Sequence, residues 1–509
     1  MDPYKIGENH ELSESDSKRV ERGAWYTPRK LVEQLVEVVW EHSEVDDQIF
    51  LDPTCGGGAF LLAVADRLVA DGIDPAEVLK RLHGLDIDHG AVEACRQALL
   101  AWAQTNGCSS SEVISQLEEQ IQCGDALAGF PSNWKSRRIY IGNPPFGTPL
   151  KSNSSELAND YRKQRKSIFG PYADRSSLHF VNCLENAEPG TAILMIMPLS
   201  VVATKHLERF REFLSSHSLK AMWVADTPLF EASVKTCAVL VETVELGSTS
   251  NSSKLVALYA GEALAPQASS LSRTWAELAA DAVGVPQVPD INTPSFRSLI
   301  QATAGFRDEY YGLAEVCIEN ESAALDTMRL ATTGMIGLLS CSWGSKQARF
   351  AKQRFDRPVV PKVVADKKVQ NWITRQESPK VLISTQSKVL KAFVDLESEY
   401  VATTPVLIVT GDDLFGFVAA LFSPVLNLIA YRQNYGAGLS TSAIKLSAAG
   451  LVALPQPVDT EFWAQGRKIV QDLVGGTPSQ ADLVELAAIM NSAYGGDEAT
   501  LAWWLDRAF

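Results

Sequence analysis

The 509-residue sequence predicts an α/β domain with a mainly parallel sheet, followed by a mixed α/β domain and C-terminal helices. Three observations predict this fold class. In the first half, short apolar runs alternate with helical patterns, as in strand–helix–strand units. A polar run then interrupts the alternation, and from about residue 305 Thr-, Val- and Ile-rich runs are separated by basic residues. We therefore expect a first domain at residues 1–245, a linker or extension at 246–300, a second domain at 301–457 and a helical segment at 458–509.

The elements of the first domain repeat in the order strand then helix, which favours parallel pairing. We expect strands at residues 48–52, 82–87, 120–123, 138–142, 191–197, 219–225 and 236–241. Helical patterns occupy residues 58–70, 90–104, 177–187 and 205–215. In the second half, we expect an apolar helix at 414–431 and a last helical stretch at 460–509.

Charge and composition exclude several classes of protein. The 46 Lys and Arg against 61 Asp and Glu give a net charge of −15, so a polyanionic partner would need a local basic patch. The eight cysteines form no C-x-x-C pair, and the seven histidines show no usual ligand spacing, so we expect no disulfide framework and no metal. The polar N-terminus and the short apolar runs predict a cytoplasmic protein without a membrane segment.

An acid and a glycine turn follow the first expected strand, in F-L-D-P-T-C-G-G-G-A-F at residues 50–60. Glycines let a backbone approach a ligand closely at the carboxyl edge of a parallel sheet, where such folds bind nucleotides. The segment matches neither G-x-x-x-x-G-K-[ST] nor G-x-G-x-x-G, which disfavours a P-loop NTPase or a standard dinucleotide site. A tight structural turn is the alternative interpretation.

Two further strand ends carry acids. The second strand ends in G-L-D-I-D at residues 84–88, where Asp86 could accept hydrogen bonds from both hydroxyls of a ribose and Ile87 could cover a purine face. Asp88 could instead cap the next helix. Asp125 follows the third strand, and three acids at strand ends are more than helix capping requires.

The most informative segment is I-Y-I-G-N-P-P-F-G at residues 139–147. Prolines cannot donate hydrogen bonds within a sheet, so the strand must stop at Asn143. The Asn143 side chain and the Pro144 carbonyl then remain as two acceptors, which can hold both hydrogens of one –NH₂ group and aim its lone pair at an electrophile. Phe146 offers a flat face to the ring that carries this nitrogen. A simple Asn-Pro turn is the alternative, which the three acids disfavour.

Together these motifs resemble the DNA adenine-N6 methyltransferases of restriction–modification systems, which use S-adenosylmethionine. In that family a Y-T-P segment, a [D/E]-P-x-C-G-x-G-x-F loop, a G-x-[D/E]-x-D strand end, a G-D and an N-P-P-[F/Y] motif occur in this order. Their counterparts here are residues 26–28, 52–60, 84–88, 124–125 and 143–146. The resemblance covers about residues 20–245 and implies a Rossmann-like methyltransferase domain. Since no recognition domain fits between Asp125 and Asn143, it must follow the catalytic domain, as in the gamma arrangement of the family.

The resemblance also implies roles for individual residues in methyl transfer to the N6 of an adenine flipped out of duplex DNA. The catalytic residues would be Asn143, Pro144, Pro145 and Phe146. Phe146 and Phe230 would stack on the target base, although Phe230 could be a core residue. The cofactor-binding residues would be Tyr26, Thr27, Pro28, Asp52, Pro53, Cys55, Gly56, Gly58, Phe60, Asp86, Ile87, Asp125, Ala126, Asn143 and Phe180.

Basic residues gather in two segments that we expect to contact DNA. Residues 346–380 hold ten basic side chains against three acidic ones. With the interleaved Trp343, Phe350, Phe355 and Trp372, this segment suits phosphate contacts and groove insertion, whereas a solvated face is the alternative. The expected DNA-binding residues are Arg162, Lys163, Arg165, Lys166, Lys346, Arg349, Lys352, Arg354, Lys367 and Lys368.

Three alternatives stay open. The N-P-P-aromatic motif also serves methyltransferases that act on RNA or on a protein glutamine, although these enzymes are generally smaller. A fused restriction enzyme is disfavoured because the segment before Tyr26 is too short for a nuclease, so a separate restriction endonuclease is the more plausible partner besides duplex DNA. The third alternative is a DNA-binding subunit with a degenerate cofactor fold, which the intact acids and Asn143 disfavour.

Overall fold

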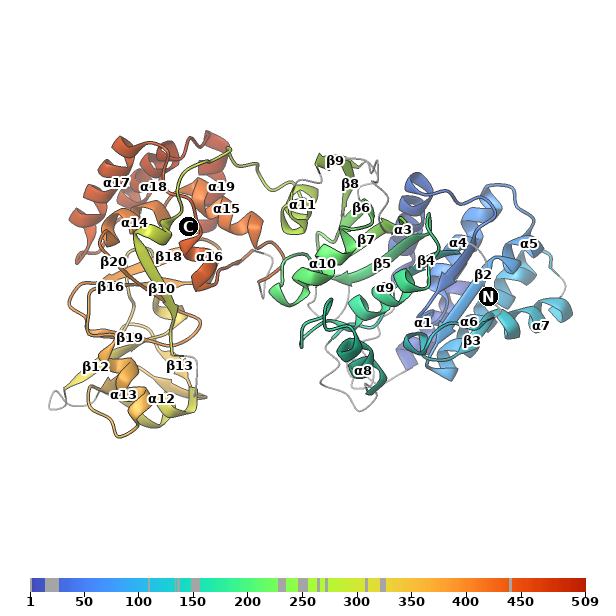
Figure 1. Ribbon diagram of the computed structural model, residues 1–509, viewed down its shortest axis with the longest axis horizontal. Helices are drawn as coiled ribbons and strands as arrows, with labels where there is room; N and C mark the ends of the chain where they lie inside the picture. The colour runs from blue at the N-terminus through green and yellow to red at the C-terminus, as the bar shows by residue number, and fades with distance from the viewer. Residues whose placement is uncertain are drawn as a thin grey trace. The chain divides into compact units, whose positions relative to one another are not determined.

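The structure is a computed structural model that divides into two compact units, Met1–Gly284 and Val285–Phe509 (Figure 1). It describes residues 2–13, 27–108, 110–132, 134, 138–147, 156–227, 235–245, 255–262, 266–270, 273–306, 310–320, 326–438 and 442–509. Two residues with predicted roles, Tyr26 and Phe230, lie outside this description.

Unit 1 is built on a nine-stranded sheet with the order β3-β2-β1-β4-β5-β7-β6-β8-β9. Its strands are β1 (Ile49–Asp52), β2 (Leu82–Asp86), β3 (Ile121–Cys123), β4 (Arg138–Gly142), β5 (Ala192–Pro198), β6 (Ser218–Val224), β7 (Thr236–Glu242), β8 (Leu255–Ala260) and β9 (Gln267–Ser270). The first five pair in parallel, whereas β7 runs antiparallel to both β5 and β6. The seven strands expected from the sequence are all present, and their ends agree to within one residue.

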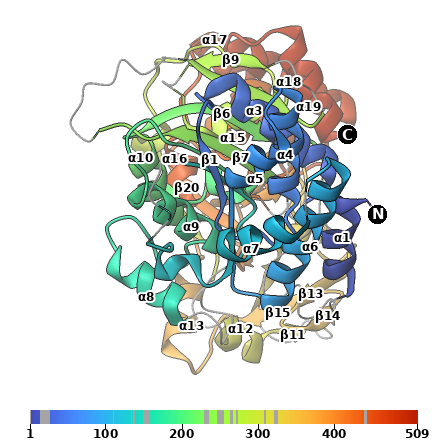
Figure 2. The same cartoon turned by 90° about the vertical axis from the view of Figure 1, so that its right-hand side faces the viewer.

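Most of the described helices of unit 1 lie between these strands in the chain, whereas the first two precede β1 and the last follows β9. They are α1 (Pro3–Ser13), α3 (Arg29–His42), α4 (Ala59–Ala70), α5 (Pro75–Lys80), α6 (His89–Thr105), α7 (Ser110–Gln120), α8 (Glu156–Gln164), α9 (Arg175–Glu185), α10 (Glu208–Leu214) and α11 (Trp275–Ala282). Apolar side chains of α3, α4 and α6 form one core with the central strands, in which Phe50, Leu61 and Ile141 are fully buried. At the start of the chain, α1 lies alongside α6 (Figure 2).

The division between the units differs from the expected domain end at residue 245. The sheet continues beyond that point, because β8 pairs in parallel with β6 and β9 pairs antiparallel with β8. The helix α11 packs on both β6 and β8. Residues 255–284 therefore complete unit 1, and unit 2 begins with the segment 285–294, which has no regular secondary structure.

Unit 2 contains two four-stranded sheets. One is antiparallel, with the order β10 (Ile300–Ala304), β20 (Leu407–Gly411), β16 (Lys380–Ser384) and β18 (Lys391–Asp395). The other is mixed, with the order β11 (Ile318–Glu319), β15 (Pro358–Pro361), β12 (Thr327–Ala331) and β19 (Tyr400–Ala402). Smaller elements are the hairpin β13 (Ala348–Phe350) and β14 (Gln353–Phe355), the pair β17 (Gln386–Ser387) and β21 (Ile444–Lys445), and the helices α12 (Tyr310–Val316) and α13 (Lys367–Thr374).

The remaining helices gather at one end of unit 2 (Figure 1). They are α14 (Leu414–Leu421), α15 (Pro424–Gln433), α16 (Ala448–Val452), α17 (Thr460–Leu473), α18 (Gln480–Ala493) and α19 (Glu498–Ala508). The single helix expected at 414–431 is thus two helices, bent by 73°. Pro424 cannot continue a helix from the preceding turn, and the Ser423 hydroxyl caps α15 by accepting from the Leu426 amide at 3.3 Å.

The described residues contain neither an unbroken membrane-spanning helix nor a metal-binding cluster. No single helix there has the length and hydropathy to cross a membrane, whereas the bent pair α14 and α15 would qualify on those two properties alone. Within the same residues, no group of three or more His, Cys, Asp or Glu side chains could hold a metal ion.

Candidate active site

Parallel pairing brings four strand ends of unit 1 to one edge of the sheet. In the register, Asp52 lies opposite Gly84, Leu51 opposite Tyr140, and Asp86 opposite Cys123. The segments that follow β1, β2, β3 and β4 therefore leave the sheet side by side. This carboxyl edge is where open α/β sheets bind their ligands.

The glycine turn after β1 is fixed by the acid at the end of β2. The Asp86 carboxylate accepts hydrogen bonds from the amides of Gly56 and Asp88, each at 2.9 Å. Gly56 and Gly58 have φ angles of 50° and 86°, in the left-handed region that favours glycine. At Gly58 a Cβ atom would also lie 2.8 Å from the Cys95 sulfur. The two glycines are thus required by backbone conformation and, at Gly58, by packing.

The other residues around this turn differ in accessibility. Ile87, beside Asp86, exposes 62% of its surface. By contrast, Cys55 and Phe60 are buried in the core, and Phe180 is fully buried with its ring edge-to-face against Phe210 at 6.1 Å. In this structure Ile87 therefore offers an apolar surface to a flat ligand, whereas Phe180 offers none.

Two acids at the edge act as helix caps. The Asp88 carboxylate accepts from the Gly90 amide at 2.8 Å, as its alternative interpretation supposed. Asp125 caps the short helix η1 (Ala126–Ala128) by accepting from the Leu127 amide at 2.9 Å. The Ala126 carbonyl is held by Asn182 at 2.8 Å, so the segment after β3 is anchored to α9.

Asp52, the last residue of β1, is buried, and its carboxyl group lies next to the end of β4. It is 2% exposed, and its carboxyl group accepts from the Thr54 amide at 3.0 Å. Burial raises its pKa to about 8, with a smaller contribution from the negative charge of Asp86. A Cβ atom on Gly142 would lie 2.6 Å from an Asp52 carboxyl oxygen, so a glycine directly before Asn143 makes room for this acid.

The Asn-Pro-Pro-Phe segment continues from β4 at the same edge. The Asn143 side-chain amide donates to the Thr27 hydroxyl at 3.1 Å, which joins the Y-T-P segment to the N-P-P motif across 116 residues of sequence. Pro144 is buried, Pro145 is half-buried, and Phe146 is 8% exposed within the core cluster. The structure thus joins Thr27 to Asn143 and packs most of the Phe146 side chain into the core.

Two residues that sequence reasoning missed hold this segment from the other side. The Asp174 carboxylate accepts from the Gly147 amide at 2.7 Å and from the Ser176 amide at 3.0 Å, where it also caps α9. The Arg175 guanidinium donates to the Phe146 carbonyl at 3.0 Å. Asp174 before a helix is a recognisable cap in the sequence, but its bond to Gly147 is a long-range contact that no local pattern indicates.

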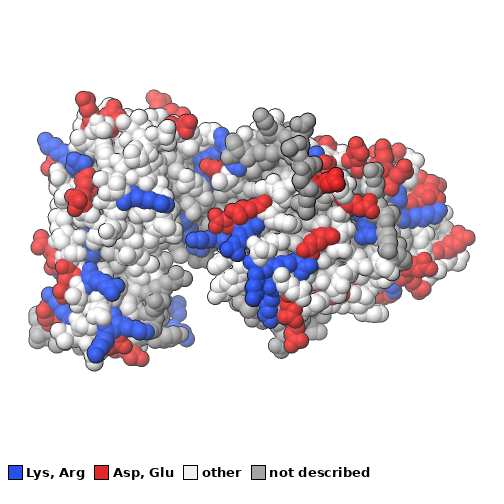
Figure 3. Space-filling view, in the orientation of Figure 1, with Lys and Arg blue, Asp and Glu red and all other residues white. Residues whose placement is uncertain are grey.

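The first basic segment lies on α8 and the turn that follows, close in sequence to the N-P-P motif. Lys and Arg side chains gather on the face of unit 1 that carries α8 and α10 (Figure 3). Lys163 and Lys166 are exposed, and Lys163 lies 3.1 Å from Asp160. Arg165 instead pairs with Glu185 at 2.6 Å and stacks on the Tyr161 ring at 3.5 Å. Arg165 therefore joins α8 to α9, whereas Arg162 is half-buried and donates weakly to the Gly170 carbonyl at 3.5 Å.

The second basic segment forms a surface on unit 2. Its exposed basic members are Lys346, Arg349, Lys352, Arg354, Arg357, Lys367, Lys368 and Arg375. Three residues counted with it lie in the interior: Phe350 and Phe355 belong to a core cluster, and Lys380 is 0% exposed and pairs with Asp395 at 2.6 Å. Groove insertion by Phe350 and Phe355 is therefore wrong for this structure, because alternate residues of the β13–β14 hairpin face the core.

In comparisons with known proteins, a family model matches the part of the chain that forms this sheet edge. Residues 12–252 match the family model of N-6 DNA methylases. The type II methyltransferase M.PaeR7I of Pseudomonas aeruginosa is 24% identical over 171 residues, a match that covers 30% of this chain and 29% of that protein. The chain thus aligns with less than a third of this relative's length.

Two solved structures resemble the fold of the chain. A structure of the type IIL restriction-modification enzyme MmeI in complex with DNA has a TM-score of 0.66 at 11% identity, covering 100% of this chain and 81% of that one. A nuclease-deletion mutant of the type ISP enzyme LlaGI with a DNA substrate mimic has a TM-score of 0.50 at 12% identity, covering 89% and 54%. The motifs, their placement at the sheet edge and the family match thus fall in the same part of the chain, residues 12–252, which is similar to the N-6 DNA methylases.

Proposed function

We propose that this protein is a site-specific DNA adenine-N6 methyltransferase, the modification enzyme of a restriction–modification or phage-defence system. The observation that carries the proposal is the position of Asn143 and Pro144 at the sheet edge that also holds the glycine turn, with Asn143 bonded to Thr27. The family match over residues 12–252 supports the reaction, and the type II relative supports the biological role.

The residues of this edge fit S-adenosylmethionine. That cofactor supplies an electrophilic methyl group on a sulfonium sulfur. Asp86 uses one lone pair on each oxygen for the Gly56 and Asp88 amides, which leaves acceptor sites for ribose hydroxyls. The exposed Ile87 would cover the purine, and Asp125 and Ala126 would lie near its amino group. Gly56 and Gly58 would admit the methionine part, with Pro53 and the segment of Thr27 and Pro28 beside it.

The chemistry of the chain's own residues is mainly positioning. The Asn143 side-chain oxygen and the Pro144 carbonyl would accept the two hydrogens of the adenine amine, so that its lone pair points at the methyl group. Orientation of this kind contributes several kcal/mol to a rate enhancement. The methylated amine then loses a proton to solvent. Phe146, held by Arg175 through its carbonyl, would contact the target base with the exposed part of its ring.

The substrate proposed is duplex DNA with one adenine unstacked, which costs a few kcal/mol. The likeness of the whole chain to MmeI, solved in complex with DNA, supports a DNA-binding role for both units. Unit 2 would be the target-recognition domain, with the surface around Lys346 to Lys368 against the phosphates. A separate restriction endonuclease would complete the system in the cytoplasm.

The test is transfer of labelled methyl from S-adenosylmethionine to unmethylated duplex DNA by the purified protein, followed by nucleoside analysis. Label on N6-methyladenine with wild type, and none with Asn143→Ala, is the expected result. Label on RNA or on a protein glutamine, in place of DNA, would show that the proposed substrate is wrong. No transfer to any of the three, with intact cofactor binding, would contradict the proposal for this chain alone.

A further inference from the structure

A pocket in unit 2 lies where the end of a parallel strand pair meets the β13–β14 hairpin. The strands β12 and β19 run in parallel, with Ala331 opposite Ala402, so that Thr332 and Thr403 follow two neighbouring strand ends. The Thr403 amide donates to the Ala331 carbonyl at 3.2 Å, which keeps the two segments together. The cavity has a volume of about 260 Å³, room for several water molecules.

The lining of this pocket is suited to an anion. Hydroxyl groups come from Thr332, Thr333, Thr403 and Thr404, and positive charges come from Lys346 and Arg349. None of the twelve described residues that line it is acidic, in a chain with a net charge of −15. Outside the lining, the Asp356 carboxylate accepts from the Gln347 side chain at 3.1 Å.

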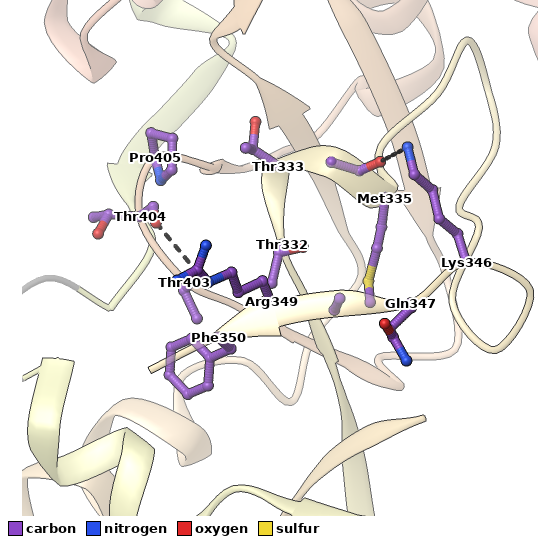
Figure 4. A pocket seen from close by; sticks show the side chains of 12 residues that line it. Thr332, Thr333, Met335, Lys346, Gln347, Arg349, Phe350, Thr403, Thr404 and Pro405 are labelled. Carbon is purple, nitrogen blue, oxygen red and sulfur yellow. Dashed lines mark hydrogen bonds between the residues drawn. The ribbon is translucent and has the colours of Figure 1, made fainter. Parts of the chain in front are cut away.

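The two cations enter from different positions on the hairpin segment. Figure 4 shows the Arg349 side chain extending toward Thr403 and Thr404, while Lys346 reaches the opposite rim. There the Lys346 ammonium lies 3.5 Å from the Gly334 carbonyl. Both side chains are mainly solvent-exposed, so they can adjust around a ligand that enters from the surface.

The hairpin beside the pocket carries a like-charge pair that favours a polyanionic partner. Arg349 lies directly opposite Arg354, and both are exposed. Like charges in directly opposed positions destabilise a strand pair. The turn between them, Ala351-Lys352, has φ angles of 50° and 66°, a conformation that places a third cation at the tip. A chain of phosphates would offset this repulsion, whereas a single small anion would reach only the pocket.

We propose that this pocket is a phosphate site for the DNA backbone. Lys346 and Arg349 neutralise one phosphate, the threonine hydroxyls orient it, and Lys352 and Arg354 face the next phosphates along the strand. The proposal rests on the proposed function, because it takes duplex DNA as the ligand. It assigns to the four threonines a role that charge counting along the sequence does not indicate.

The test is the salt dependence of DNA binding by the full chain. Fluorescence anisotropy with a labelled duplex of arbitrary sequence and with one that carries the mapped methylation site gives the association constant between 50 and 200 mM salt. Lys346→Ala and Arg349→Ala should each make the negative slope of log K against log salt shallower by about 0.9 on both duplexes. Over that salt range, each variant should therefore lose roughly threefold less affinity than wild type loses. Arg349→Lys should restore the wild-type slope. Thr332→Val should weaken DNA binding but leave the slope unchanged.

The matched control is Lys468→Ala, since Lys468 is an exposed cation on α17, at the opposite end of unit 2 from β13 (Figure 1). It should leave the slope unchanged. Unaltered slopes for both Lys346→Ala and Arg349→Ala would overturn the proposal. A loss of affinity confined to the duplex with the methylation site would also overturn it, because such a loss indicates contacts with bases. Wild type that binds duplex DNA but methylates none of it would contradict the proposed function and leave the pocket test valid. Wild type that binds no duplex would overturn both.

Discussion

The two units bring polar side chains together by different routes. In unit 1, a run of parallel strands delivers Asp52, Asp86 and Asn143 to one edge, where backbone amides and Thr27 fix the turn and the amide in place. In unit 2, the proposed phosphate pocket combines one parallel strand pair with cations from an exposed hairpin. Methyl transfer needs fixed geometry, whereas neutralising a phosphate depends mainly on charge. The rigid edge therefore suits chemistry, and the exposed hairpin suits binding.

The units also treat buried charge differently. Asp52 has no cation paired with it in the described residues, and its pKa is raised to about 8, so below that pH it is mainly neutral. In unit 2, Lys380 and Asp395 form a buried ion pair at 2.6 Å, and the carboxylate also accepts from the amides of Glu399 and Tyr400. Asp52 is neutralised by a proton, whereas Asp395 is neutralised by Lys380. Substitutions at Asp52 and at Lys380 should therefore have different consequences.

The largest expected effect concerns the edge of unit 1. Asn143→Ala removes one of the two proposed acceptors and should lower the rate of methyl transfer on the order of 1,000-fold, as for loss of a preorganised polar group in other active sites. Cofactor affinity should stay within a few-fold of wild type. Single-turnover kinetics and calorimetric titration with S-adenosylmethionine measure the two quantities. Retained transfer would remove Asn143 from the proposed mechanism.

A change in the core of unit 2 should leave unit 1 intact. Lys380→Met leaves the Asp395 carboxylate buried without its ion-pair partner, which should cost about 3–5 kcal/mol of stability in unit 2. Calorimetric unfolding and DNA affinity should both report this loss, while cofactor binding by unit 1 persists. The exposed Lys388→Met is the control and should change stability by less than about 0.5 kcal/mol. Equal loss of cofactor binding in Lys380→Met would show that the units do not behave separately.

Asn143 and Lys380 also show which features of the structure can be predicted from the sequence. Asn143 is predictable because its neighbours in the chain, two prolines and an apolar strand, determine where the strand ends and what is left at the edge. The alternating pattern also predicts the parallel pairing of the first five strands, but not the order of the strands in the sheet. Lys380 is one of ten basic residues in its segment, and only the pairing of β16 with β18 shows that it faces the interior. A count of charges along the chain does not indicate which face of a strand they occupy.

Other differences have the same origin. Unit 1 ends at residue 284 rather than at the expected 245, because β8 pairs with β6. This pairing joins segments that are distant in the sequence, so local composition does not indicate it. The pocket of unit 2 draws on residues near 332, 346 and 403, so no single stretch of sequence contains it. The break at Ser423-Pro424 has a local cause, a capping serine before a proline, which the single helix expected at 414–431 did not take into account.

A smaller effect should separate positioning from stability at Asp174. Asp174→Asn keeps an acceptor for the α9 cap but replaces the oxygen that accepts from the Gly147 amide, so the segment after Phe146 loses one support. We expect kcat to fall between about tenfold and a hundredfold, as for small misplacements of reacting groups, with little change in the melting temperature. Asp174→Ala, which also removes the cap, should lower stability by about a further 1 kcal/mol. Equal melting losses in both variants would contradict a positioning role.

The smallest effect per pH unit is the pH dependence of stability that the buried acid gives unit 1. The pKa of Asp52 is about 8 in the folded state against 3.8 for the ordinary carboxyl, so in the unfolded chain Asp52 is ionised from about pH 4 upward, while the folded state keeps its proton. Stability must therefore fall as pH rises through this window, and the fall levels off above the folded pKa. Between pH 7 and 8 the loss should be about 1 kcal/mol, since one pKa unit corresponds to about 1.4 kcal/mol. Asp52→Asn, which stays neutral, should lack this loss, so the melting temperatures of variant and wild type should diverge with rising pH and approach each other near pH 4. Parallel melting curves across that range would mean that Asp52 is ionised in the folded protein, and that unit 1, like unit 2, keeps a charged carboxylate in its interior.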